Sequence, residues 1–250
     1  MAGAITGKQL EAEARRELTA AGDPRVAAQA RVYFKSGEAV RFYGVRATAT
    51  REIARRLAAQ VRNAWRLDDA MAFCEAMLRE PELEAKSVGI LVLGAFRRQF
   101  EKRMAREIER WLDDDLCADW ATTDALCAAV LTPLIELHPD LVATLQSWTR
   151  RRSLWLRRAS AVPLTHFARR GRHLDEIYAI AEALFAYPED LIHKANGWML
   201  RDAGRTDLAR LEAFLLAHGP RIPRTTIRYA IEKFPPARRK TLLACTRAEN

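Results

Sequence analysis

Apolar positions recur along most of the chain at intervals of three and four residues, the spacing of one face of a helix. A first helix is predicted to end at Gly22, and its buried positions are Leu10, Ala14 and Leu18. Pro24 can open a second helix, because proline is tolerated in the first turn, and this helix should extend through Phe34. Sustained two-residue alternation does not occur, so no sheet is predicted.

Further helices follow a loop at residues 36–47. Thr50 is predicted to cap the next helix, whose buried positions are Ile53, Leu57, Val61 and Trp65. The pattern predicts more helices over residues 68–80, 83–100, 104–112 and 155–169, the last one kinked at Pro163. Trp65, Trp111, Trp148 and Trp155 are assigned to packing.

An internal repeat organises these helices. When the second helix of each predicted pair is aligned, five alanines coincide with spacings of 40, 34, 36 and 35 residues: Ala85, Ala125, Ala159, Ala195 and Ala230. This is the period of paired-helix solenoids. The alternative is a chance alignment in an alanine-rich chain. We expect an all-α fold, a right-handed α-solenoid of HEAT-like paired helices with a concave basic groove, forming one domain over residues 1–250.

The residue before each aligned alanine then occupies one structural position. These residues are Glu84, Asp124, Arg158, Lys194 and Tyr229, and they should form a strip along one face. Trp120 lies one helical turn before Asp124, and Trp198 lies one turn after Lys194. The spacing therefore predicts that aromatic, acidic and basic side chains converge.

Positive charge is concentrated in the second half of the chain. The net charge is +9, with a pI near 9.8, and residues 141–250 contain 20 basic and 10 acidic side chains. Such asymmetry is typical of a surface that binds a polyanion, because Arg and Lys contacts to phosphate release counterions. Solvated helix faces in an arginine-rich protein are the alternative interpretation. An arginine cluster spans a predicted helix junction and comprises Arg150, Arg151, Arg152 and Arg157.

Cysteine and histidine spacing gives no indication of a metal site or cofactor. Cys74, Cys117, Cys127 and Cys245 lie among apolar neighbours, as expected of reduced core thiols in a cytosolic protein. The five histidines form no H-x-x-x-H or H-E-x-x-H arrangement. The first residues carry no long apolar segment, so we expect a cytoplasmic protein without a membrane span.

Three short motifs resemble one family. They are Trp120-Ala-Thr-Thr-Asp124, Leu154-Trp-Leu-Arg-Arg-Ala159 and Lys194-Ala-Asn-Gly-Trp-Met-Leu-Arg201, within a similarity covering about residues 30–240. Together they resemble the AlkD-like HEAT-repeat alkylpurine DNA glycosylases. The resemblance implies that Trp120, Asp124 and Trp198 form a cleft against the damaged nucleotide, that Arg158 holds the backbone, and that Tyr33 touches DNA beside the lesion. It also implies that the damaged base stays near the stack rather than entering an enclosed pocket.

The chemistry of these residue types agrees with that implication. An N3- or N7-alkylated purine is a cationic leaving group, so hydrolysis mainly requires stabilisation of the positive charge that develops on the deoxyribose. A carboxylate such as Asp124 can supply this stabilisation and orient the attacking water, while the rings of Trp120 and Trp198 attract cations. Each residue also has a structural interpretation: Asp124 as an acid serving a helix start, the two tryptophans as core residues, and Arg158 as a solvated side chain.

We therefore expect a monofunctional, metal-free DNA glycosylase that removes alkylated purines from double-stranded DNA as a cytoplasmic monomer acting on the nucleoid. Lys194 joins the arginines as an expected DNA contact. A second hypothesis is a protein of the same fold that binds damaged or branched DNA without excising a base. A third is a scaffold whose basic face meets an acidic protein partner.

Overall fold

The computed structural model describes residues 5–34 and 40–247. Helices dominate these residues, which contain no strand and only an isolated bridge between Arg41 and Glu82. The chain divides into two compact units, Met1–Leu137 and His138–Asn250, which are called unit 1 and unit 2 below. The all-α fold of paired helices is confirmed. The expectation of a single domain stays a prediction, and each unit is described by itself.

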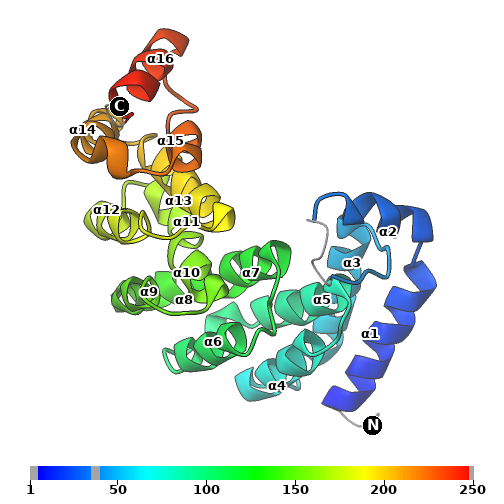
Figure 1. Ribbon diagram of the computed structural model, residues 1–250. Helices are drawn as coiled ribbons and strands as arrows, with labels where there is room; N and C mark the ends of the chain where they lie inside the picture. The colour runs from blue at the N-terminus through cyan, green and yellow to red at the C-terminus, as the bar shows by residue number, and fades with distance from the viewer. Residues whose placement is uncertain (1–4, 35–39, 248–250) are drawn as a thin grey trace. The chain divides into compact units, whose positions relative to one another are not determined.

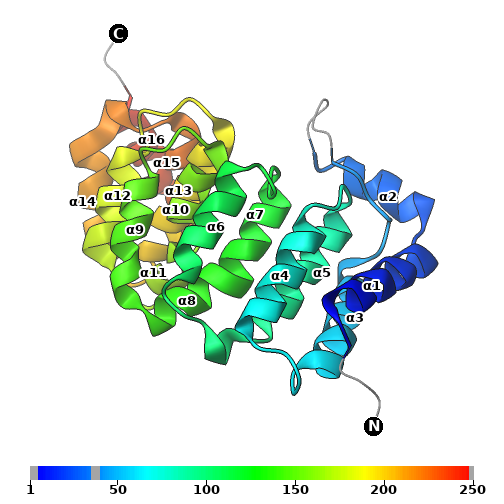
Figure 2. The same cartoon turned by 90° about the horizontal axis from the view of Figure 1, so that it is seen from below.

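Unit 1 is built around the central helix α5. Its elements are α1 (Gly7–Ala21), α2 (Pro24–Arg31), α3 (Ala47–Val61), α4 (Leu67–Leu78), α5 (Leu83–Gly94), α6 (Met104–Asp113), α7 (Trp120–Leu126), a π-helical segment (Cys127–Leu131) and α8 (Thr132–Leu137). Figures 1 and 2 show α5 between α3 and α7, and it also packs on α4. The core of unit 1 therefore lies around α5.

Unit 2 places its helices in two layers. Its elements are α9 (Val142–Trp148), α10 (Leu154–Ala161), α11 (Leu164–Ala168), α12 (Leu174–Ala183), α13 (Asp190–Ala203), α14 (Leu208–His218), α15 (Arg224–Ala230) and α16 (Pro236–Cys245). In Figure 1, α10, α13 and α15 stack in one layer, while α9, α12 and α14 form the layer beside it. Helix α13 is central, since it contacts α10, α11, α12 and α15.

Most of the aligned alanines are buried, as the repeat predicts. Four of them are buried at the helix contacts, on α5, α10, α13 and α15: Ala85, Ala159, Ala195 and Ala230. Ala125 on α7 is half-buried and lines a cleft. Helices α13 and α15 approach closely near Ala195, where a Cβ on Gly197 would lie 2.5 Å from Cβ of Tyr229. The four buried alanines thus let neighbouring helices approach closely, whereas Ala125 departs from this pattern.

Three predicted helix ends are wrong. The helix predicted over residues 83–100 ends at Gly94 and is followed by a short 3-10 segment, Arg97–Gln99. Thr50 does not cap a helix, because α3 already begins at Ala47 after Arg46. The Thr50 hydroxyl is buried and donates to the Arg46 carbonyl at 3.2 Å, so this threonine packs inside the first turns. Helix α2 ends at Arg31, and Val32 and Tyr33 lie in the turn that follows. The predicted loop at residues 36–47 lies partly outside the described residues.

Proline shapes two of the longer helical stretches. The π-helical segment ends just before Pro133, whose missing N–H and bulky ring would otherwise face the carbonyl of Ala129 four residues earlier. The π-helical turn is wider than an α-helical turn and so avoids this clash. The helix therefore continues from α7 into α8 without a break. At Pro163 the stretch instead separates into α10 and α11, and the Thr165 amide donates to the Val162 carbonyl at 3.2 Å. The interruption expected at Pro163 is therefore present.

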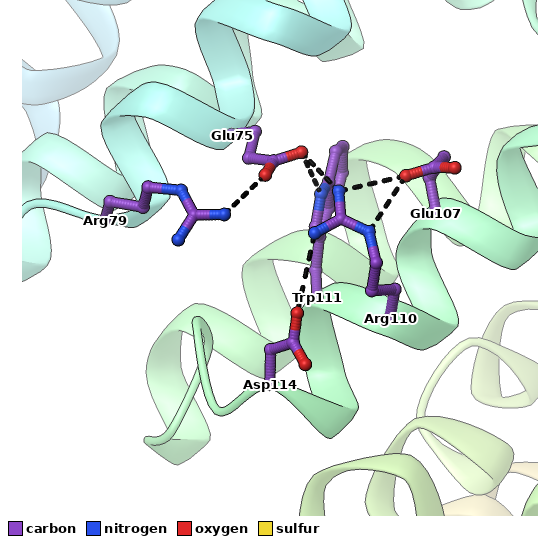
Figure 3. A network of polar contacts seen from close by, with 6 residues as sticks. All are labelled: Glu75, Arg79, Glu107, Arg110, Trp111 and Asp114. Carbon is purple, nitrogen blue, oxygen red and sulfur yellow. Dashed lines mark hydrogen bonds and ion pairs between the residues drawn. The ribbon is translucent and has the colours of Figure 1, made fainter.

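A carboxylate network fastens α4 to α6. Glu75 accepts hydrogen bonds from Arg79 at 2.6 Å, from the indole N–H of Trp111 at 3.0 Å, and from Arg110 (Figure 3). Arg110 also donates to Glu107 and pairs with Asp114. The Arg110 guanidinium is the largest of the influences that lower the pKa of Glu75 to about 2. Glu75 is therefore ionised throughout the ordinary pH range and holds Trp111 in place.

Burial settles the expectations for cysteine and tryptophan. Cys74, Cys117 and Cys127 are buried, and burial raises the pKa of the Cys117 thiol to about 12. The prediction for Cys245 is wrong, because this residue is exposed at the end of α16, where few apolar side chains remain to cover it. Of the tryptophans assigned to packing, Trp155 is only half-buried, and the buried ones are Trp65, Trp111 and Trp148.

Within the part of the chain that the structure describes, one helical stretch is long and apolar enough to cross a membrane by length and composition alone. It is Trp120–Leu137, with a mean hydropathy of 1.2 and half of its residues buried inside the protein. The stretch also carries Asp124 and the proline-induced π-helical turn. These features fit a packed core helix of unit 1.

Candidate nucleic-acid interface

The start of α7 fixes Trp120 and Asp124 in place. Asp119 caps this helix, accepting the Thr122 amide at 2.8 Å as well as the Thr122 hydroxyl. Thr122 and Thr123 are fully buried, and the Thr123 hydroxyl donates to the Cys117 carbonyl at 2.8 Å. The capping role considered for Asp124 thus belongs to Asp119. Asp124 lies one turn after Trp120 and is half-buried.

Trp120 forms part of an aromatic wall. Its ring stacks on that of Phe34 with centroids 5.3 Å apart and planes inclined by 23°, and Phe42 meets Phe34 edge-on at 5.4 Å. These rings line a cleft of about 590 Å³ within unit 1, together with side chains from α2, α3, α5 and α7. Sequence reasoning missed this cleft, because Phe34 and Phe42 follow no helical spacing relative to Trp120 and their contact depends on tertiary packing.

Glu84 anchors the turn that carries the aromatic wall. Its buried carboxylate accepts the backbone amides of Tyr43 at 3.0 Å, Gly44 at 2.9 Å and Val45 at 3.0 Å. Gly44 has φ +82°, and a Cβ there would lie 2.1 Å from the Asp23 carbonyl oxygen. The first member of the predicted polar strip is therefore an internal anchor rather than a side chain facing solvent, which corrects the expectation for Glu84.

Exposed side chains surround the mouth of this cleft. Tyr33, expected to touch DNA, lines the cleft and is 78% exposed, and the neighbouring Val32 is 81% exposed. Arg46 and Arg51, which sequence reasoning did not select, also line the cleft and are exposed. Unit 1 thus combines an apolar cleft with positive charge at its rim, although its half of the chain has no excess of basic residues.

The repeat register brings three strip residues together in unit 2. Arg158 is buried, and its Nη1 donates to the Leu191 carbonyl at 2.6 Å. Lys194 pairs with Asp190 at 2.8 Å, and this hydrogen bond is the largest influence raising the pKa of Lys194, while Arg158 acts in the opposite direction. Tyr229 acts on the same lysine and is 37% exposed. Arg158 on α10 and Tyr229 on α15 therefore both adjoin α13, the helix that carries Lys194.

Arg157 organises the arginine cluster from inside. Its Nη1 donates to the carbonyls of Arg151 at 2.8 Å and Arg152 at 2.7 Å, and its Nη2 pairs with Glu189. The guanidinium also lies 4.4 Å from the centre of the Tyr187 ring. Arg157 is buried, whereas Arg150, Arg151 and Arg152 are exposed. This geometry favours a structural role for Arg157, which fixes the backbone that presents the other three.

Trp198 stands one turn after Lys194 on α13. It is half-buried, and its indole nitrogen is covered without a hydrogen-bond partner among the described residues. Its neighbour Gly197 allows the tight contact between α13 and α15. Trp198 and the strip residue Lys194 thus lie one turn apart on the same helix of unit 2.

Comparison with known proteins identifies the family. The profile of the family described as "DNA alkylation repair enzyme" matches residues 14–234. The chain belongs to this DNA alkylation repair family. A solved structure described as a predicted DNA alkylation repair enzyme from Enterococcus faecalis is similar, with a TM-score of 0.76 and 18% identity over 86% of this chain and 97% of that one. No curated protein matches the chain.

Membership of the DNA alkylation repair family confirms the resemblance found in the motifs and supports a role in DNA repair. The candidate residues fall in both units: Tyr33, Trp120 and Asp124 in unit 1, and Arg158, Lys194 and Trp198 in unit 2. Their convergence in one groove stays a prediction. In residues 5–34 and 40–247, no group of three or more histidine, cysteine or acidic side chains could hold a metal ion.

Proposed function

We propose that this member of the DNA alkylation repair family is a monofunctional DNA glycosylase. It hydrolyses the N-glycosidic bond of cationic N3- or N7-alkylated purines in double-stranded DNA, using no metal or cofactor. It acts as a cytoplasmic monomer on nucleoid DNA. The observation that carries the proposal is the arrangement on α7, where Asp119 caps the helix and Asp124 lies one turn beyond Trp120.

Asp124 is assigned the electrostatic step. As the bond between sugar and purine breaks, the electron pair leaves with the base, and positive charge develops on the deoxyribose. A carboxylate beside the sugar stabilises that charge more than it stabilises the ground state, which lowers the barrier. The same carboxylate orients the water that adds to the sugar and accepts its proton.

Trp120 and Trp198 are assigned to the cationic nucleotide. An indole ring attracts a cation over its face, and the attraction is stronger where water is excluded. The stack with Phe34 holds the Trp120 ring in one orientation, which avoids an ordering cost when DNA binds. The alkylated purine needs little acid assistance, and the resemblance to the AlkD-like glycosylases implies that the base stays near the stack.

The remaining residues are assigned to the DNA backbone. Arg150, Arg151 and Arg152 are exposed at a junction pinned by Arg157, and guanidinium groups suit phosphate oxygens. Arg158 and Lys194 contribute positive charge on the strip of unit 2, and Tyr33 contacts DNA from unit 1. If these side chains contact phosphates, removing one of them should weaken DNA binding and make the affinity less dependent on salt concentration.

Incubation with duplex DNA that carries 7-methylguanine or 3-methyladenine tests the proposal. Release of the free methylated base, leaving an abasic strand that breaks in alkali, is the expected result. Tight binding of the same DNA without any release would contradict the glycosylase and favour the non-catalytic binder. Failure to bind DNA at all would instead favour the scaffold.

A further inference from the structure

The cleft of unit 1 has the size and lining of a ligand site. Its volume is about 590 Å³, within the range of roughly 300–1,000 Å³ common for small-molecule sites. Four aromatic residues line it, Tyr33, Phe34, Phe42 and Trp120, and the last three form the stacked wall. Apart from Trp120, the lining residues of α7 and of the π-helical segment after it are all alanines, including Ala121, Ala125 and Ala128. Space beside the rings is therefore left open rather than filled by protein.

The rings offer a surface for a flat partner. Phe34 and Trp120 lie nearly parallel, and Phe42 braces Phe34 from its edge. The turn that carries Phe42 is fixed by Glu84 through the three following amides. In a preorganised stack of this kind the side chains already have fixed positions. Little of their conformational entropy is therefore lost when a planar aromatic group binds.

Charge distinguishes the interior of the cleft from its rim. Glu84 is the one acidic residue among the described lining residues, and three N–H donors compensate its carboxylate. Arg46 and Arg51 are the basic ones, and both are exposed. The cleft therefore suits a planar, weakly polar group inside and anionic groups at the rim. A nucleotide combines these two features in its base and its flanking phosphates.

We propose that this cleft is a subsite for one unpaired nucleobase, which stacks on Phe34 and Trp120 while Arg46 and Arg51 hold the neighbouring phosphates. A base in an intact duplex is already stacked on both faces and must be extruded first, whereas a bulged base is available without that cost. The subsite makes the protein prefer DNA that contains an unpaired base. It goes beyond the proposed glycosylase activity and does not depend on base release.

Three undamaged DNA probes separate binding of the base from binding of bent DNA. The first is a fully paired duplex, the second carries one bulged adenine, and the third carries a bulged abasic analogue with the same backbone but no base. Because stacking on an aromatic side chain strengthens binding substantially, the adenine bulge should bind about tenfold more tightly than the abasic bulge, ~1.4 kcal/mol.

Filling the cleft tests its location. Ala128 lines the cleft and is exposed, so Ala128→Phe occupies the space without removing a core contact. This substitution should abolish the preference for the adenine bulge and leave the affinity for the paired duplex unchanged. Ala59→Phe, an exposed position of α3 that does not line the cleft, should keep the preference. If Ala128→Phe fails to fold, Ala128→Leu serves as the smaller filling variant.

Either of two results would overturn the proposal. One is equal affinity of the parent for the two bulged probes, which would show that no base is held. The other is an equal weakening of all three probes by Ala128→Phe, which would make this face a general duplex contact. None of the probes carries a methylated base, so these outcomes are independent of whether the protein is a glycosylase.

Discussion

The ring of Trp120 stacks on that of Phe34 with their centroids 5.3 Å apart. Phe34 lies just after α2 and Trp120 opens α7, so the contact joins segments 86 positions apart in the sequence. Trp120 carries one of the assigned catalytic roles, and the stack ties that role to the packing of the first helices of unit 1.

Phe34→Ala should loosen Trp120. Aromatic pairs contribute about 0.5–1.5 kcal/mol beyond their buried area, so the free energy of unfolding should fall by at least that amount. Base release should slow by about tenfold, because a mobile Trp120 must be ordered in the transition state. Phe214→Ala is the matched control, since Phe214 packs on Tyr178 in unit 2 at 4.8 Å. It should lower stability without a comparable loss of base release.

The Glu75 network should make stability depend on acid pH. Glu75 is held at a pKa of about 2 by Arg110, below its ordinary value of 4.5. Its contribution is therefore fully present above about pH 4.5 and is lost as the pH falls towards 2. Glu75→Gln should lower the free energy of unfolding at pH 7 by on the order of 2 kcal/mol. Denaturant unfolding of both proteins should show this difference shrinking below pH 4.5, and a constant difference would contradict the role of Glu75.

Glu84→Gln should release the turn around Gly44. An amide side chain offers one oxygen in place of the carboxylate that accepts three backbone N–H groups. Hydrogen bonds to a charged group contribute about 1.5–3 kcal/mol each, so the amides of Gly44 and Val45 should exchange with solvent at least tenfold faster. Native-state hydrogen exchange measures this change. Glu52→Gln, at an exposed position on α3, should leave those two amides unaffected.

Exposed and buried arginines of the α9–α10 junction should behave differently. Arg152→Ala removes an exposed charge, so DNA binding should weaken and the slope of log affinity against log salt should fall by about 1. Arg157→Ala removes the internal guanidinium and should mainly lower the melting temperature. Arg62→Ala, exposed at the end of α3, is the control for a general charge effect. An unchanged salt slope in Arg152→Ala would exclude a phosphate contact there.

Local spacing predicted most of the helices and the burial of four of the five aligned alanines. The alanines of α5, α10, α13 and α15 are buried because a period near 35 residues returns the same helix face to each pair. Arg158 and Tyr229 adjoin α13, the helix of Lys194, whereas their convergence in a binding strip stays a prediction. These successes share one cause, since helical period and repeat length are properties of the sequence itself.

The errors depend on contacts between distant segments. Thr50 was a plausible cap by residue type, but the backbone after Val45 is fixed by Glu84 and starts the helix earlier. The aromatic cleft could not be predicted, because Phe34, Phe42 and Trp120 meet only in the folded unit. Burial of Arg157 was equally hidden, since one of its partners, Glu189, lies 32 positions away in the sequence.

The rate of base release by Asp124→Asn tests the central claim most directly. Single-turnover release of 7-methylguanine from duplex DNA should fall by on the order of 100-fold, because the neutral amide cannot stabilise charge on the deoxyribose. DNA affinity should change little. Asp113→Asn, the same change at an exposed residue ending α6, should release base at the parent rate. Release by Asp124→Asn at the parent rate would contradict the catalytic role of Asp124.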